Sequence, residues 1–225
     1  MNFLHHEQIY RGKDILDKIK VFPICICGAG AIGSNLAENL VRQGFRNLTV
    51  IDKDRIEDRN INTQTWTIRD IGSLKVHALK NMIFQICKVE IKIVPKEIQR
   101  EKDLIRYLRR FPDFIGNVAV KDSFILIDAF DNSKSRNLIK NFYEKNLYPC
   151  LHIGFSGEYG EIIWNEDYQV PDDKGVDDCD YPLARNLILL LVAVASEVII
   201  KFATKGIKEN YTVTLKDFHI ERYRP

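Results

Sequence analysis

The sequence lacks several features that would place it in a particular class of protein. Lysine and arginine number 33 and aspartate and glutamate 31, so the net charge of +2 gives no electrostatic case for a nucleic-acid or membrane partner. The first 20 residues are polar and charged, so we do not expect a secretory signal. Without repeats or a low-complexity linker, we expect one domain over residues 1–225, with residues 1–20 as an N-terminal arm.

Cysteine and long apolar runs are also scarce. The five cysteines form no Cys-x-x-Cys pair, so we expect no structural zinc, no disulfide framework and a reducing, cytoplasmic location. The longest apolar run, residues 187–200, is broken by Ser196 and Glu197 and is shorter than the ~20 residues that span a bilayer. We therefore predict a helix buried in a core or at a subunit interface.

The most informative stretch is residues 21–75. An apolar run ends at Gly28-x-Gly30-x-x-Gly33, a helical pattern begins at Ala31, and the next apolar run ends at Asp52. Glycines at this spacing let the backbone approach a phosphate, and the helix start offers free N–H groups. An acidic residue at the end of the second strand is placed to accept from a ribose hydroxyl. The pattern predicts a nucleotide site without saying which nucleotide.

The rest of the chain alternates strand and helix patterns as far as residue 154. This favours an α/β fold with a doubly wound, mostly parallel Rossmann-like sheet, followed by antiparallel C-terminal strands. We expect the first strand at residues 21–27, a helix capped by Asp70 and ending near Cys87, and a long helix starting at Pro182. Residues 166–181 form an acidic crossover loop before that helix.

Two further residues favour a triphosphate over a nicotinamide cofactor. Lys75 supplies a cation for the leaving oxygens of a triphosphate. Asp131 follows a buried strand at the edge where ligands bind in open α/β sheets, and its carboxylate can hold Mg²⁺. Asn132 can cap the next helix and leave Asp131 available.

These motifs together resemble the ThiF/MoeB superfamily, the adenylating fold shared with ubiquitin-activating enzymes. The family pattern has a glycine turn, Asp-x-Asp-x-Val-Glu-x-Ser-Asn-Leu-x-Arg-Gln, Gly-x-x-Lys and Thr-Asp-Asn. Here these stand as Gly28/Gly30/Gly33, Asp52-x-Asp54-x-Ile56-Glu57-x-Arg59-Asn60-Ile61-Asn62-Thr63-Gln64, Gly72-x-x-Lys75 and Phe130-Asp131-Asn132. The resemblance extends over nearly the whole chain.

The resemblance implies an enzyme that uses ATP and Mg²⁺ to adenylate the C-terminal carboxylate of a small ubiquitin-like or sulfur-carrier protein or peptide. It also implies a homodimer. The implied ATP-binding residues include Asp54, Thr63 and Asn132. Asp52 would hold the ribose, Asn60 and Gln64 would line the nucleotide, and Lys75 and Asp131 would act on the phosphates and the metal.

Two departures from the family pattern leave alternatives open. Thr63 stands where the family has a phosphate-binding arginine, and Glu7-Gln8-Ile9 stands where it has Arg-Gln-Ile. An arginine on a transferring phosphate is worth ~10³–10⁵ in rate. Unless Arg11 or Arg59 substitutes, the chain is a catalytically weak nucleotide-binding scaffold. A nicotinamide-dependent oxidoreductase is a third interpretation, but it leaves Lys75 and Asp131 unexplained.

Cys179 lies in the acidic loop, where some relatives of the family carry a reactive cysteine. Its five neighbouring aspartates should raise the pKa of the thiol, which is poor for a nucleophile. A catalytic cysteine and a solvated loop both remain interpretations of this segment.

Overall fold

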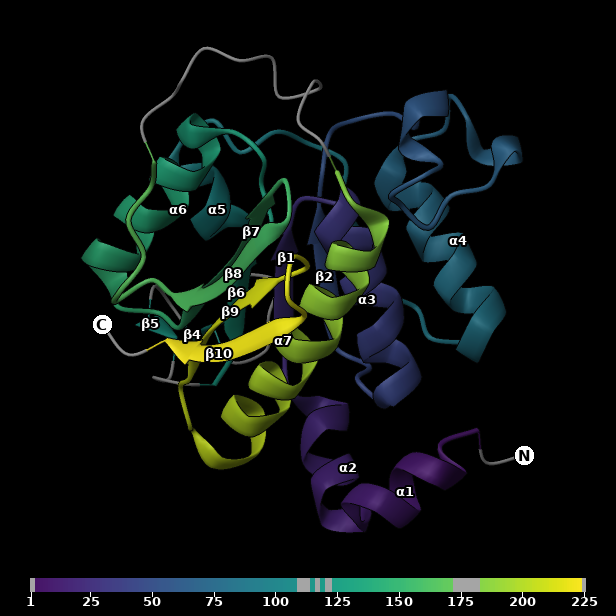
Figure 1. The fold of residues 1–225 in the computed structure, drawn as a ribbon, viewed down its shortest axis with the longest axis vertical. Coiled ribbons are helices and arrows are strands. Elements are labelled where there is room, and N and C mark those ends of the chain that lie inside the picture. Colours follow the sequence, from purple (N-terminus) through teal and green to yellow (C-terminus); the bar gives the residue numbers. More distant parts are fainter. Residues whose placement is uncertain (1–2, 109–113, 116–117, 120–122, 172–182, 224–225) are drawn as a thin grey trace.

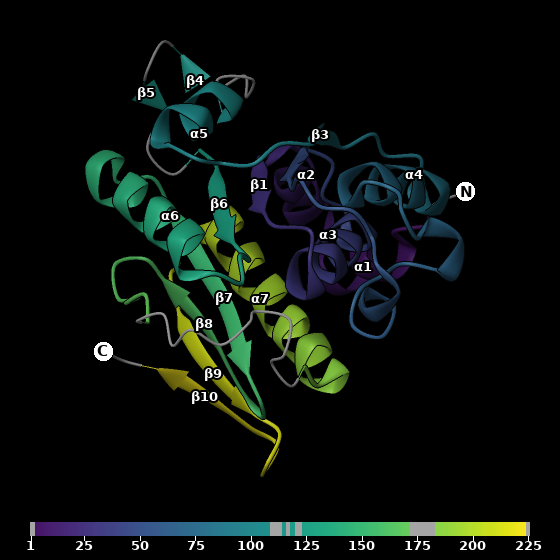
Figure 2. The ribbon, with the colours of Figure 1, turned by 90° about the horizontal axis from the view of Figure 1, so that it is seen from above.

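The computed structural model describes residues 3–108, 114–115, 118–119, 123–171 and 183–223. Eight strands form one sheet in the order β10-β9-β8-β7-β6-β1-β2-β3 (Figures 1 and 2). Strands β1, β2, β3, β6 and β7 pair in parallel, and β7 to β10 pair antiparallel. This confirms the predicted α/β fold. The strands of the main sheet are β1 (Ile24–Cys27), β2 (Leu48–Ile51), β3 (Lys92–Val94), β6 (Ile125–Asp128), β7 (Cys150–Ser156), β8 (Tyr159–Trp164), β9 (Asn210–Thr214) and β10 (His219–Tyr223).

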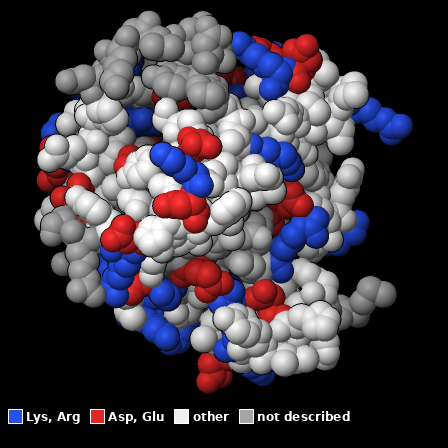
Figure 3. Space-filling view, viewed as in Figure 1, with Lys and Arg blue, Asp and Glu red and all other residues white. Residues whose placement is uncertain are grey.

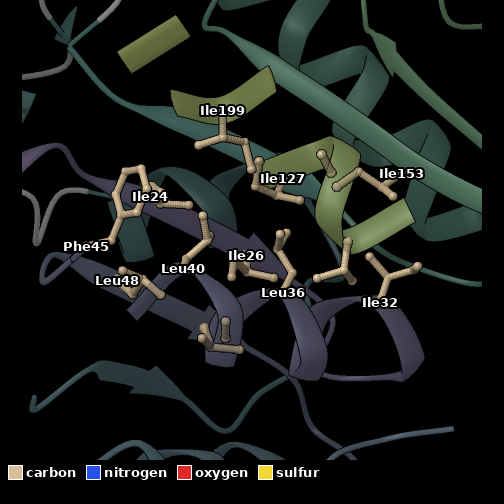
Figure 4. Close-up of a cluster of buried hydrophobic side chains, with 14 of the residues drawn as sticks. Ile24, Ile26, Ile32, Leu36, Leu40, Phe45, Leu48, Ile127, Ile153 and Ile199 are labelled. Carbon is tan, nitrogen blue, oxygen red and sulfur yellow. The ribbon is translucent and has the colours of Figure 1, made fainter. Parts of the chain in front are cut away.

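Helices cover both faces of this sheet, and β1 shows why. Successive side chains of a strand point to opposite faces, so Ile24 and Ile26 pack with α3 and α7, while Cys25 and Cys27 pack with α5 and α6. Figure 4 shows Ile26 among the side chains of the first of these two cores. The helices are α1 (His5–Arg11), α2 (Lys13–Val21), α3 (Ala31–Gln43), α4 (Lys75–Cys87), α5 (Glu101–Leu108), α6 (Ser133–Asn146) and α7 (Arg185–Lys205), and β4 (Phe114–Ile115) and β5 (Val118–Ala119) form a separate hairpin.

The long helix α7 runs along the sheet beside α3 (Figure 1). It has 21 residues, with a mean hydropathy of 2.3 over its most apolar window, so by length and composition it is able to cross a bilayer. The sequence prediction that it is too short for this was wrong. However, 56% of that window is buried inside the fold, as in the core helix of a soluble protein.

Two local predictions, the start of the first strand and the helix cap at Asp70, were wrong for identifiable reasons. Val21 ends α2, so β1 begins only at Ile24, after Pro23. The N-terminal arm holds two helices, because Gly12, with a φ of +83°, separates α1 from α2. Asp70 accepts from the backbone N–H of Thr67 and closes the 3₁₀ turn Ile68–Asp70, whereas α4 begins at Lys75. The expected helix start at Pro182 and most of the acidic loop lie outside the described residues.

The topology places a site at one edge of the sheet. After β1 the chain builds β2 and β3 on one side, and it then crosses to β6 on the other side of β1. Ligands of open α/β sheets bind at such a switch point, outside the carboxyl ends of the strands. The residues that follow β1, β2 and β6 are therefore the ones to consider together.

Candidate functional site

The three glycines of the turn between β1 and α3 serve two different purposes. Gly28 has a φ of +103°, and a Cβ on it would lie 2.8 Å from the backbone oxygen of Ala129, just after β6. A Cβ on Gly33 would overlap the backbone oxygen of Gly28. Internal packing therefore requires these two glycines. A Cβ on Gly30 would meet no atom within 4 Å, so the space next to this residue is open to a ligand.

The amino end of α3 lies at this open position. Gly30 precedes the helix and has no side chain to cap it, and the first turn contains no acidic residue. The N–H groups of a first helical turn have no partners within the helix and form the positive end of its dipole. The glycine turn and Ala31 thus lie at the open amino end of α3, and their binding of a phosphate stays a prediction.

Asp52, directly after β2, holds the glycine turn in place. Its Oδ2 accepts from the backbone N–H of Ala29 at 2.6 Å, and its Oδ1 accepts from that of Asp54 at 2.7 Å. Burial raises the pKa of Asp52, and the charge of Lys75 and these two N–H groups offset part of that rise. The structure thus gives Asp52 a positioning role that was not predicted, and its contact with ribose stays a prediction.

The structure brings Lys75 to the same edge, and its action on a phosphate stays a prediction. It is the first residue of α4, its side chain is almost buried, and its ammonium lies 3.4 Å from Oδ2 of Asp54. The backbone N–H of Lys75 also donates to the backbone oxygen of Asp54 at 2.9 Å. The segment after β2 and the start of α4 therefore form one unit, in which a lysine lies among carboxylates.

The loop between β2 and α4 packs against the first two turns of α3. Asn35 of α3 donates to the backbone oxygens of Ala31 and Thr63, at 2.7 and 2.9 Å. Asn60 accepts from the N–H of Glu57, and Gln64 accepts from the indole of Trp66. Thr63 and Gln64 are buried. These predicted nucleotide residues thus shape the loop, and any direct contact with a nucleotide stays a prediction.

Asp131 lies three residues beyond the end of β6 and is exposed. Its neighbour Asn132 caps α6 by accepting from the N–H of Ser135 at 2.9 Å, so the capping role falls to Asn132. Within the described residues no group of three or more His, Cys, Asp and Glu side chains is arranged to hold a metal. A single carboxylate fits Mg²⁺, which takes most of its other ligands from water and phosphate oxygens.

A buried polar cluster next to this edge was missed from the sequence. His152 of β7 is fully buried, and its Nδ1 lies 3.1 Å from Oδ2 of Asp128, the last residue of β6. Its ring stacks on Tyr168 at 3.7 Å, and its Nε2 lies 3.6 Å from Oε1 of Glu161. Gly154 leaves room for the ring, since a Cβ there would lie 2.5 Å from Nε2. The sequence signal was a histidine and an aspartate in adjacent parallel strands.

The two arginines considered as substitutes are both in ion pairs. The Arg11 side chain is largely buried, with Nε 2.6 Å from Glu7 and a further pair with Glu197 of α7. Burial lowers the pKa of Arg11, but the hydrogen bonds with Glu197 and Glu7 raise it overall. Arg59 lies 2.6 Å from Glu57 on the surface of the loop. Arg11 therefore joins α1 to α7 and is not directed at the site of its own chain.

The described cysteines do not provide a nucleophile. Cys25, Cys27 and Cys150 are buried, and burial raises the pKa of Cys150 well above its ordinary value. Cys87, partly buried, donates to the backbone oxygen of Ile83 within α4. Cys179 lies outside the described residues, so its predicted catalytic role stays a prediction.

Comparison with known proteins assigns the family. The ThiF family pattern matches residues 5–218, so the chain belongs to the ThiF family and has the fold of E1-like adenylyltransferases. It is 26% identical over 148 residues to SUMO-activating enzyme subunit uba-2 of Caenorhabditis elegans, covering 65% of this chain and 23% of that protein. It is 31% identical over 150 residues to tRNA threonylcarbamoyladenosine dehydratase of Haemophilus influenzae, covering 64% and 51%.

A solved structure shows the same fold. Escherichia coli MccB, determined with ATP, superposes with a TM-score of 0.76 and 18% identity over all of this chain and 71% of its own. Among the relatives matched by sequence, the chain spans about a quarter of the length of the SUMO-activating subunit and about half of the length of the dehydratase.

Proposed function

We propose that the protein binds Mg·ATP at the carboxyl ends of β1, β2 and β6 and adenylates the C-terminal carboxylate of a small ubiquitin-like or sulfur-carrier protein or peptide. The observation that carries this proposal is the open turn at Gly30 on the same sheet edge as Lys75 and Asp131. A triphosphate needs close approach of the backbone, positive charge and a metal ligand. A nicotinamide dinucleotide needs only the close approach of the backbone. MccB, which has this fold and was determined with ATP, supports ATP as the nucleotide.

In this reaction a carboxylate oxygen attacks the α-phosphorus, and pyrophosphate leaves with the electron pair of the broken P–O bond. The N–H groups at the start of α3 hold a phosphate, and Lys75 offsets charge on the leaving pyrophosphate. Asp52 fixes the glycine turn through Ala29 and accepts from the ribose. Mg²⁺ on Asp131 would neutralise further phosphate charge. Catalysis is then mainly positioning and electrostatic stabilisation.

The acyl substrate is proposed from the relatives' names and from surface charge. One relative is named for SUMO, and MccB has been solved with MccA. Another relative is named for a tRNA nucleoside. On the face shown in Figure 3, basic and acidic side chains are interspersed, which does not favour an RNA-binding surface there. A protein or peptide C-terminus is therefore the preferred substrate.

A catalytically weak scaffold of the same fold is the second candidate. Thr63 carries no charge, and Arg11 is occupied by Glu7 and Glu197. Both observations favour nucleotide binding with slow chemistry unless another cation contributes.

We also propose that the chain acts as a homodimer through the outer side of α7. Leu189 is 43% exposed there, with Leu190 and Val194 partly buried beside it. Light scattering should give twice the chain mass for the wild type and the monomer mass for Leu189→Glu. A wild-type monomer at micromolar concentration would refute this interface.

The test of activity is ATP–pyrophosphate exchange with candidate carrier proteins, together with binding of ATP and NAD. We expect carrier-dependent exchange that is lost in Lys75→Ala and Asp131→Ala and kept in the control Lys80→Ala, on the same helix as Lys75. ATP binding without exchange for any carrier favours the scaffold. Tight binding of NAD without ATP would overturn the proposal.

A further inference from the structure

Arg185, the first residue of α7, reaches the nucleotide edge from a distant part of the chain. Its guanidinium donates to the backbone oxygen of Asn62 at 3.1 Å. Asn62 precedes Thr63, whose backbone oxygen is held by Asn35 in the first two turns of α3. Arg185 therefore contacts the loop directly beside the residue that is bonded to α3. This is near the amino end of α3, where a phosphate would bind.

The charge of Arg185 is not neutralised by a carboxylate within the part of the chain that the structure describes. Lys75 is paired with Asp54 at 3.4 Å, and Arg59 with Glu57 at 2.6 Å. The bond of Arg185 goes to a neutral carbonyl, and the residue is exposed. A triphosphate adds negative charge to an edge that already carries Asp52 and Asp54, so a cation that is not paired with a carboxylate would strengthen its binding.

The start of α7 is otherwise poorly arranged for helix stability. Ala184 precedes the helix without a side-chain cap, and the first turn contains Arg185 but no acidic residue. A cation at this end opposes the helix dipole, and alanine is among the weakest caps. Sequences break such local rules mainly at functional sites, and a bound anion would relieve both unfavourable features.

We propose that Arg185 binds the phosphate chain of the nucleotide and supplies the positive charge that Thr63 does not. The planar guanidinium suits this role because it can donate two parallel hydrogen bonds to phosphate oxygens. The proposal rests on the proposed function, since it assumes that ATP occupies this edge. It makes α7 part of the nucleotide site as well as part of the core.

The test uses Arg185→Gln, Arg185→Lys and the control Arg55→Gln. Glutamine keeps a donor for the Asn62 carbonyl and removes the charge, and lysine keeps the charge. Arg55 is an exposed arginine that also donates to a backbone carbonyl, that of Gly72 at 2.6 Å. Calorimetry should be run with Mg·ATP, inorganic tripolyphosphate and adenosine. For Arg185→Gln we expect the affinities for ATP and tripolyphosphate to fall about tenfold or more. The affinity for adenosine should be unchanged.

The remaining variants separate charge from a structural role. Arg185→Lys should recover part of the ATP affinity, Arg55→Gln should bind ATP like the wild type, and the salt dependence of ATP binding should be shallower in Arg185→Gln. If Arg185→Gln binds ATP as tightly as the wild type while Lys75→Ala binds it more weakly, the proposal for Arg185 is overturned and the proposed function is not. Absence of ATP binding by the wild type would overturn the proposed function itself.

Discussion

The ammonium of Lys75 lies 3.4 Å from the carboxylate of Asp54, and its charge also acts on Asp52 at the end of β2. A phosphate that binds Lys75 therefore competes with Asp54 for it. The same lysine helps to keep Asp52 ionised in spite of its burial, so it supports the carboxylate that holds the glycine turn.

We predict that Lys75→Met raises the pKa of Asp52 further. The folded-state pKa of Asp52 is already above the ordinary 3.8, so between pH 3.8 and that raised pKa the folded chain holds a proton that the unfolded chain has released. In that window the free energy of unfolding falls as pH rises, and the fall extends to higher pH in the variant. Carboxyl NMR titration measures the shift, with Lys80→Met as the control. An unchanged Asp52 pKa would contradict the electrostatic link.

The Arg11–Glu197 pair should contribute measurably to stability, because Arg11 is largely buried. We predict that Glu197→Gln lowers the free energy of unfolding by about 1–3 kcal/mol. Urea denaturation measures this. Glu38→Gln, which breaks the exposed pair with Arg42 within α3, should cost no more than about 0.5 kcal/mol. Equal effects of the two variants would show that Arg11 does not depend on Glu197.

The buried Asp128–His152 pair should be more costly to break. In His152→Leu the carboxyl group of Asp128 stays buried, and among the described residues only the N–H of Phe130, at 3.2 Å, remains as its hydrogen-bond partner. We predict a loss of about 3 kcal/mol, since a buried carboxyl group loses a hydrogen-bond partner and Tyr168 loses the ring on which it stacks. The exposed His77 on α4 provides the control, and His77→Leu should be near neutral. A loss below about 1 kcal/mol would mean that the contact with His152 contributes little to the stability of the fold.

The parts of the site that follow local chemistry were predictable from the sequence. The glycine turn, Asp52, Lys75 and the capping by Asn132 each follow from spacing within a strand or helix boundary. The start of β1 was not predictable, because the apolar residues Val21 and Phe22 suit a buried strand as well as the end of a helix. Asp70 was assigned to α4 because its own 3₁₀ turn gives no hydrophobic period.

The parts that depend on tertiary register were not predictable. His152 meets Asp128 only because β6 and β7 pair with these residues opposite one another. Arg185 meets Asn62 across more than a hundred residues of sequence, through the packing of α7 beside α3. Neither contact leaves a local pattern in the sequence.

The glycines give opposite predictions for stability and for binding. Gly33→Ala should cost about 3 kcal/mol, because its Cβ overlaps the backbone of Gly28 and the core cannot yield there. Gly30→Ala should leave the free energy of unfolding within about 1 kcal/mol of the wild type, because its Cβ meets no atom. Thermal and urea unfolding distinguish the two, and a similar loss in both would contradict an open space at Gly30.

The most direct test of the central claim is the affinity of Gly30→Ala for Mg·ATP, measured by calorimetry beside the wild type. If the phosphates bind against the backbone at Gly30, the wild type binds Mg·ATP and the folded variant binds it about tenfold or more weakly. If the folded variant binds Mg·ATP as tightly as the wild type, the phosphates do not occupy this edge of the sheet.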